Sequence, residues 1–309
     1  MTQLSIIIPT KDREIIFRET LNRALYATAE IDAEIIIVND SKTNPIVIAP
    51  QQKNVLVLNN TGQGVASARN SGAAAAQSSL LLFLDDDMLI NKDLIKKALQ
   101  LNAEYPEAAF NFNWEYPVEL RSQIQQQPFG RFLESIQFTT MKGWCRGMEW
   151  HDDKMFATTG LAGATLLIPR KIYFGVKGYD ASFPFAGAED HDFSSRLVKA
   201  GYKAYVYPMI KAWHNEINKT SLRGFLQRTY NNAITRKHAT TIGYEELKLI
   251  YSPLKKTVYT IAHYFQKPLL YLTDHWINSS YFDFIYFKLS HLIVGLYIYK
   301  GYNNIPFEK

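Results

Sequence analysis

Cysteine is nearly absent, since Cys145 is the single one among 309 residues. No intramolecular disulfide can form, so a reducing compartment is the natural expectation. We also expect no secretion signal, because the apolar run at residues 4–8 is too short for one and stops at Pro9. No uncharged apolar run reaches the roughly 18 residues needed to span a bilayer. These absences predict a cytoplasmic protein.

Internal repeats, low-complexity tracts and recognised nucleic-acid-binding motifs are also missing from the sequence. The composition is that of an ordered globular chain, 47% hydrophobic and 20% charged. The formal net charge of +5 is uneven. Residues 1–214 are close to neutral, and the surplus of Lys and Arg lies in residues 215–309, among many aromatic side chains. Such a region favours an anionic membrane surface over a nucleic acid as a partner.

Short apolar runs alternate with helix-like stretches through the first third of the chain. Buried strands are predicted at residues 4–8, 34–38, 54–58 and 80–84, and helices at residues 13–28 and 64–76. Continuous apolar strands separated by helices predict an α/β fold, with a mostly parallel sheet flanked by helices.

Polar residues follow three of these strands. Thr10 comes directly after Pro9, Asp40 follows the second strand, and three aspartates at 85–87 follow the fourth. In parallel sheets ligands bind beyond the carboxyl ends of the strands. We therefore expect all three clusters to converge on one crevice.

The middle third of the chain is less regular. Residues 105–160 contain several Trp, Pro and Gln residues, and we interpret them as loops and short elements around a binding site. Further on, the acidic residues at 189–192 open a predicted amphipathic helix that stops at Gly201.

The three aspartates at 85–87 repel one another unless a cation or a solvated loop compensates their charge. Carboxylate oxygens suit Mg²⁺ or Mn²⁺, which bind one or two carboxylates together with phosphate oxygens. A divalent ion held there would neutralise the charge that builds on a diphosphate leaving group. The alternatives are a solvated turn and an N-terminal cap for a helix at residues 91–101.

Eight segments occur in an order shared with one enzyme family. In chain order they are IIIPTKDR at 6–13, IIIVNDS at 35–41, GVASARNSG at 64–72, LFLDDD at 82–87, Gly163-Ala164, Gly178-Tyr179-Asp180, Glu189-Asp190-His191-Asp192, and His214. On these segments the chain resembles the family 2 glycosyltransferases, which have the GT-A fold of nucleotide-diphospho-sugar transferases. The resemblance covers about residues 4–214.

The resemblance implies a donor site in the first part of the chain. Its members are Pro9, Thr10, Arg13, Asp40, Arg69, Asp85 and Asp86. Thr10 and Asp40 match positions that hold the nucleoside, and Pro9 and Arg13 shape the first loop. Arg69 matches a residue near the diphosphate and base. In the acidic run, Asp85 matches the ribose side of the pair of metal-site aspartates.

The resemblance also implies the metal ligands and the catalytic base. Asp87 and His214 match positions that hold Mn²⁺ or Mg²⁺, and Asp190 matches the base. Inverting sugar transfer needs a base to take the proton of the acceptor hydroxyl, and a carboxylate near a helix N-terminus is kept ionised. Helix capping is the alternative role for Asp190.

Acceptor contacts are the least defined part of the predicted site. We expect Glu189 to bind the acceptor. Trp144 and Trp150 are candidates for stacking on sugar rings, with ordinary loop or core packing as the alternative.

The C-terminal region differs from the first part in pattern, so we divide the chain near residue 215. Residues 1–215 are the expected GT-A catalytic domain, and residues 216–309 a helical, basic and aromatic appendage. An amphipathic helix lying among lipid headgroups would explain its composition. A helical appendage packed on the catalytic domain, or a dimer contact, would explain it equally well.

The function expected from the sequence is inverting, metal-dependent transfer of one sugar from a nucleotide diphosphate sugar, with uridine the favoured base, to a glycan or lipid-linked acceptor. Cell-surface polysaccharide assembly is the expected setting. Processive members of the family share a Gln-x-x-Arg-Trp segment, which Gln227-Arg228-Thr229-Tyr230 does not match. The alternatives are a sugar nucleotidyltransferase, which the glycine-free loop at 9–13 disfavours, and a non-catalytic nucleotide-sugar sensor docked to membrane.

Overall fold

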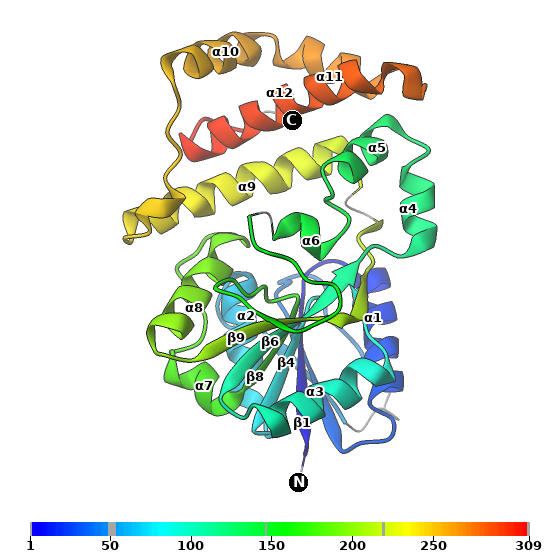
Figure 1. The fold of residues 1–309 in the computed structure, drawn as a ribbon, viewed down its shortest axis with the longest axis vertical. Helices are drawn as coiled ribbons and strands as arrows, with labels where there is room; N and C mark the ends of the chain where they lie inside the picture. The colour runs from blue at the N-terminus through cyan, green and yellow to red at the C-terminus, as the bar shows by residue number, and fades with distance from the viewer. Residues whose placement is uncertain (1, 49–53, 146, 218–219, 308–309) are drawn as a thin grey trace. The chain divides into compact units, whose positions relative to one another are not determined.

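The computed structural model describes residues 2–48, 54–145, 147–217 and 220–307 (Figure 1). The chain divides into two compact units. Unit 1 comprises Met1–Glu115 and Arg146–Asn215, and unit 2 comprises Tyr116–Cys145 and Glu216–Lys309. The sequence-based division placed residues 116–145 in the catalytic domain, whereas in the structure they cluster with the C-terminal helices.

Unit 1 is built on a mixed sheet with nine strands among the described residues, in the order β3-β2-β1-β4-β8-β6-β9-β5, with β7 on β9. The parallel half is β3 (Val55–Asn59), β2 (Ala33–Asn39), β1 (Leu4–Thr10) and β4 (Leu80–Leu84). The other half contains β5 (Met88–Leu89), β6 (Ala108–Glu115), β7 (Phe156–Ala157), β8 (Thr165–Pro169) and β9 (Lys203–His214). There β8 runs antiparallel to β4 and β6, while β9 is parallel to β6. The expected α/β sheet of the GT-A type is therefore confirmed.

Helices flank this sheet (Figure 1). They are α1 (Glu14–Ala27), α2 (Gly64–Ala75), α3 (Lys92–Glu104), α7 (Arg170–Gly175) and α8 (Ala188–Lys199). The Asn91 side chain accepts a hydrogen bond from Leu94 N and caps α3. On α2, Gly72 allows close contact with β1, because a Cβ there would lie 2.4 Å from Ile7 Cγ2.

Strand β1 continues through Pro9, where the sequence predicted its end. Hydrogen bonding alternates between the two neighbours of a strand, and the Thr10 carbonyl accepts from Asp40 N at the end of β2. The backbone nitrogen of Pro9 therefore points toward β4, and the pairing between β4 and β1 stops at Ile7. The missing N–H of Pro9 costs no ladder hydrogen bond at that position.

Strand β6 lies in the segment that the sequence predicted to form loops and short elements, and it is a central strand of the sheet instead. Its residues are buried from Ala108 to Trp114. The polar positions of the strand are satisfied internally, since Asn111 Nδ2 donates to Ala162 O at 2.7 Å and Asn113 Nδ2 to Pro208 O at 3.3 Å.

Unit 2 is helical in its described residues. It contains α4 (Val118–Ile124), α5 (Pro128–Ser135), α6 (Met141–Trp144), α9 (Leu222–Thr241), α10 (Pro253–Tyr264), α11 (Gln266–Asp274) and α12 (Asp283–Tyr302), with short 3₁₀ helices η2 (Glu245–Leu247) and η3 (Ser280–Phe282). Its core combines Phe132 of α5, Leu226 of α9, and Ile293 and Tyr297 of α12. In Figure 1, α12 lies between α9 and the α10–α11 pair, and α12 contacts all three.

Two observations explain why residues 116–145 belong to unit 2. Phe129 and Phe132 enter its hydrophobic core. The guanidinium of Arg131 forms a two-pronged ion pair with Asp283 at the start of α12, with N–O distances of 2.7 and 2.8 Å.

One helix in the described part of the chain, Ser280–Tyr302, is long and apolar enough to cross a membrane. The expectation that no uncharged apolar run reaches this length still holds, because Asp283, Lys288 and Lys300 lie within the helix. The helix qualifies by length and composition only, and a core helix of a soluble protein can have the same length and composition.

Candidate functional site

Three clusters of predicted site residues lie at the ends of β1, β2 and β4, which are neighbours in the sheet. Thr10, the last residue of β1, donates from its hydroxyl to Asp86 Oδ2 at 2.6 Å. Asp86 is buried and also accepts from Arg13. The acidic run after β4 and the first loop after β1 therefore meet, as the strand order predicted.

A buried arginine gathers three of the predicted carboxylates. From α2, Arg69 places Nη2 at 2.9 Å from Asp85 Oδ1 and Nη1 at 3.2 Å from Glu189 Oε1 and 3.5 Å from Asp190 Oδ1. Glu189 is fully buried, whereas the Asp190 side chain is 23% exposed. We call these four residues the Arg69 centre.

Two residues that the sequence analysis gave no role hold this centre in place. Gly163 leaves room for the guanidinium, because a Cβ there would lie 2.2 Å from Arg69 Cζ. The ring of Tyr179 lies 4.9 Å from the same atom in a cation–π contact. Asp190 Oδ1 accepts hydrogen bonds from Gly163 N at 3.0 Å and from the Tyr179 hydroxyl at 3.1 Å. Both residues lie in segments that carried the family resemblance, which is the signal that could have marked them.

These bonds bear on the alternative that Asp190 caps a helix. The residue at the cap of α8 is Gly187, whose φ of 135° is open to glycine and which makes no side-chain cap bond. Its N–H donates to Glu189 instead. The Asp190 carboxylate is thus oriented by Gly163 and Tyr179.

The Arg69 centre has three carboxylates around one guanidinium, and its pKa values reflect that imbalance. Burial, followed by the charge of Asp190, raises the pKa of Glu189 to about 8 despite the opposing effect of Arg69. Burial also raises the pKa of Asp190, which Arg69 lowers and Asp85 raises further. Below the pKa of Glu189 the centre retains one proton, which we place on the Glu189 carboxylate.

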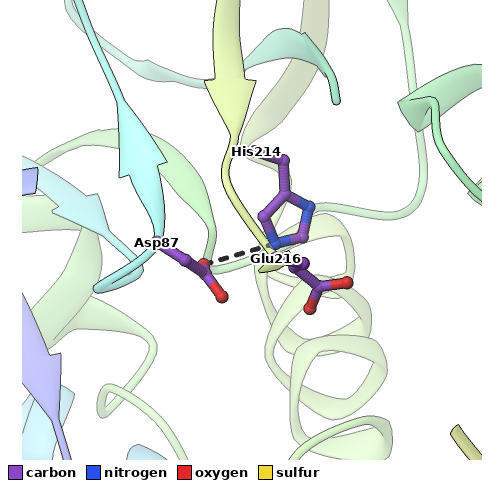
Figure 2. Close-up of side chains that lie close together, drawn as sticks. All are labelled: Asp87, His214 and Glu216. Carbon is purple, nitrogen blue, oxygen red and sulfur yellow. Dashed lines mark ion pairs between the residues drawn. The ribbon is translucent and has the colours of Figure 1, made fainter. Parts of the chain in front are cut away.

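The other end of the acidic run forms a second centre. Asp87 Oδ2 lies 2.8 Å from Arg13 Nη2. Asp87 Oδ1 lies 3.2 Å from His214 Nε2, as Figure 2 shows. The antiparallel pairing of β5 with β9 sets Met88 opposite His214 and so brings Asp87 beside the imidazole. We call Arg13, Asp86, Asp87 and His214 the Asp87 centre.

A third possible metal ligand was missed from the sequence. Ligand atoms of Asp87, His214 and Glu216 all lie within 4.8 Å of one another (Figure 2). Glu216 also pairs with Arg228 and accepts from the Tyr116 hydroxyl. Two carboxylates and an imidazole fit a divalent cation. The His-x-Glu spacing could have revealed it, because alternate residues of an extended segment face the same side.

Asp40, predicted to bind the nucleoside, is held at the end of β2. Its carboxylate accepts from Gly64 N at 3.1 Å and Asn60 Nδ2 at 2.7 Å, and pairs with Lys11 at 3.1 Å. Gly64 is the first residue of α2, so Asp40 is anchored at a helix N-terminus.

The two tryptophans proposed as acceptor contacts belong to different units. Trp144 of unit 2 donates from Nε1 to Phe138 O at 2.7 Å and packs its ring on Phe138. Trp150 of unit 1 donates to Asp152 at 2.7 Å and packs against Phe156. Both rings take part in local packing, and their acceptor role stays a prediction.

Known proteins are similar to this chain in sequence and in fold. Residues 5–151 match the model for glycosyl transferase family 2, and residues 151–220 match the model for the N-terminal domain of galactosyltransferase. An uncharacterized glycosyltransferase of Haemophilus influenzae is 31% identical over 63% of the chain. The match spans 62% of that relative's own length.

Two solved structures share the fold at low sequence identity. A mannosyltransferase from Pyrobaculum calidifontis, solved with GDP-Man and Mn²⁺, has a TM-score of 0.55 and 13% identity, over 95% of this chain and 85% of its own. S. aureus TarS 1–349 in complex with UDP has a TM-score of 0.51 and 14% identity, and the match covers 100% of this chain and 93% of the TarS chain. The two solved structures show the GT-A fold. The family model and the sequence relative support a family 2 glycosyltransferase, the family that the ordered segments resemble.

Proposed function

We propose that this protein is an inverting glycosyltransferase that moves one sugar from a nucleotide diphosphate sugar to an acceptor hydroxyl, with Asp190 as the base. The observation that supports this most is the Arg69 centre. It combines a partly exposed carboxylate, oriented by Gly163 and Tyr179, with a pKa raised by burial. A base works best when its pKa approaches the operating pH.

In the proposed reaction the acceptor oxygen attacks the anomeric carbon, and the bond from that carbon to the diphosphate oxygen breaks. The acceptor proton passes to Asp190. Because the hydrogen bonds from Gly163 and Tyr179 both end on Oδ1, we assign the proton to Oδ2. A divalent cation held by Asp87, His214 and Glu216 would stabilise the charge on the departing diphosphate.

Donor and acceptor are proposed from similarity and from the sequence. The two structural neighbours bind UDP and GDP-Man. We favour a UDP-sugar and Mn²⁺ or Mg²⁺, with Asp40 and Thr10 on the nucleoside side. For the acceptor we propose a glycan or a lipid-linked glycan in cell-surface polysaccharide assembly. The enzyme would then work in the cytoplasm, on the inner face of the plasma membrane, with residues 216–309 in peripheral contact.

The test is nucleoside diphosphate release from a panel of UDP-, GDP- and dTDP-sugars, with membrane extract as the source of acceptor. Each donor is assayed with Mn²⁺, with Mg²⁺ and with chelator, for wild type, Asp87→Ala and the control Asp93→Ala. Asp93 is an exposed carboxylate in the first turn of α3.

We expect one donor to give metal-dependent release that Asp87→Ala loses and Asp93→Ala keeps. A silent panel would refute sugar transfer and leave the nucleotide-sugar sensor as the better hypothesis. Release of pyrophosphate from a nucleoside triphosphate and a sugar phosphate would instead identify a nucleotidyltransferase.

A further inference from the structure

An exposed apolar stripe runs along α10 of unit 2. Leu254, Val258, Ile261 and Phe265 follow one another at intervals of four, three and four residues, which places them on one helical face. None of them is buried: Leu254 is 74% exposed, Ile261 54% and Phe265 58%. A helix of a folded unit normally turns such a stripe toward the core.

Exposed apolar side chains also occur on the elements that follow α10 in the chain. They are Tyr271 and Leu272 on α11, Tyr281 on η3 at 85% exposure, and Phe284 and Ile285 on the first turn of α12. Figure 1 shows α10 and α11 on the side of α12 away from α9. Extended apolar patches are rare on soluble monomers and mark interaction surfaces.

The charge of this surface has one sign. Residues 249–273 contain Lys255, Lys256 and Lys267 and no Asp or Glu. The lysine before this range, Lys248, pairs with Glu245 at 3.4 Å. Lys255 and Lys256 are exposed on the first turn of α10, next to Leu254.

The next acidic residues along the chain are already neutralised. Asp274 pairs with Arg223 at 2.7 Å, and Asp283 pairs with Arg131 at 2.7 Å. The surface therefore offers apolar side chains, aromatic rings and uncompensated lysines together, a combination that fits the interface of an anionic bilayer.

We propose that α10, α11, η3 and the first turn of α12 form a face that docks on an anionic lipid surface. The inference rests on the peripheral membrane contact proposed above and locates it on one part of unit 2. The α10 stripe enters the boundary between headgroups and acyl chains, and Lys255 and Lys256 contact the phosphates. Helix α12 stays in the protein, because its Ile293 and Tyr297 belong to the core of unit 2.

The experiment is flotation of the full-length protein with two kinds of vesicle, pure phosphatidylcholine and phosphatidylcholine mixed with phosphatidylglycerol, at low and at high salt. We expect binding only to the anionic vesicles, weakened by salt. Each juxtamembrane lysine contributes about 1 kcal/mol, so Lys255→Gln/Lys256→Gln should weaken binding roughly thirtyfold. The matched control is Lys171→Gln/Lys203→Gln, two exposed lysines of unit 1.

A second pair of variants separates apolar docking from charge. Leu254→Ser/Ile261→Ser should weaken vesicle binding at least about tenfold, whereas Ile15→Ser, at an exposed apolar residue of unit 1, should have no effect. Equal binding to both vesicles, or equal binding by the lysine variant and its control, would overturn the proposal. So would binding that withstands high salt, which points to insertion of α12, or self-association that Leu254→Ser/Ile261→Ser abolishes without vesicle binding.

Donor turnover is measured in solution on the same preparations. Vesicle binding without turnover refutes the proposed enzyme function and keeps the docking face. Turnover without vesicle binding refutes the docking face and keeps the proposed enzyme function.

Discussion

Three consecutive aspartates supply two centres of opposite character. Asp85 faces the Arg69 centre, where three carboxylates surround one guanidinium. Asp87 faces a histidine and an arginine, so its charge is balanced by the guanidinium or by a metal. Asp86, between them, is buried and accepts hydrogen bonds from Thr10 and Arg13, so it joins the loop after β4 to the loop after β1.

The difference teaches how one short segment can serve two kinds of chemistry. Surplus negative charge in a buried place raises carboxylate pKa values, so the Arg69 centre is suited to holding and moving a proton. An imidazole beside carboxylates is suited to holding a cation. Variants that disable one centre and spare the other test this division.

The largest expected effect comes from Asp190→Asn. Asparagine keeps an oxygen that can accept from Gly163 and Tyr179, so the fold and donor binding should persist. Without a base, kcat should fall by about 10²–10⁴-fold. The measurement is steady-state donor turnover beside calorimetric nucleotide binding, with Asp180→Asn as the matched control. Retained turnover would remove Asp190 from the chemistry.

Glu189→Gln should change the dependence of stability on pH. The pKa of Glu189 is about 8 in the folded protein and 4.5 as its ordinary value. Below pH 4.5 both states are protonated. Between 4.5 and about 8 the unfolded state ionises first, so the free energy of unfolding falls as pH rises, by at most a few kcal/mol.

Glutamine cannot ionise, so the variant should lose this slope. Urea unfolding of wild type, Glu189→Gln and the exposed control Glu104→Gln across this pH window measures it. A wild-type stability that rises relative to Glu189→Gln over the same window would mean that attraction to Arg69 exceeds the cost of burial.

His214→Ala probes the other centre. It removes one nitrogen ligand and leaves Asp87 with Arg13. We expect Mn²⁺ affinity, measured by calorimetry, to fall at least about tenfold, and turnover to recover partly at high Mn²⁺. His151→Ala, at a histidine paired with Glu149, should leave affinity unchanged. Equal affinities in the two variants would exclude His214 as a ligand.

The sequence was informative where a function depends on the end of a strand. Four apolar runs located β1 to β4, although β3, predicted to be buried, lies at the edge of the sheet and none of its residues is buried. The polar residues after these runs proved to be neighbours because parallel strands share an edge. It failed where a partner lies far along the chain. The alternation of Phe and Asn in β6 is stable as a buried strand only because Asn111 finds Ala162 O, 51 residues away. Segment 116–145 likewise joins unit 2 through Arg131 and Asp283, a pairing that local pattern does not encode.

The smallest expected effect is that of Tyr179→Phe, and it tests how the Arg69 centre sets its base. The change removes one hydroxyl, which donates to Asp190 and lowers its pKa, and keeps the ring over Arg69. The pKa of Asp190 should therefore rise. Because the base must be ionised, the acid limb of the pH profile of kcat/KM should move to higher pH, by up to about one unit. Tyr173→Phe is the matched control, since the Tyr173 hydroxyl donates to Asn70. A limb that moves equally in both variants would report general loosening of the aromatic cluster, and a limb that moves only in Tyr179→Phe would assign it to Asp190.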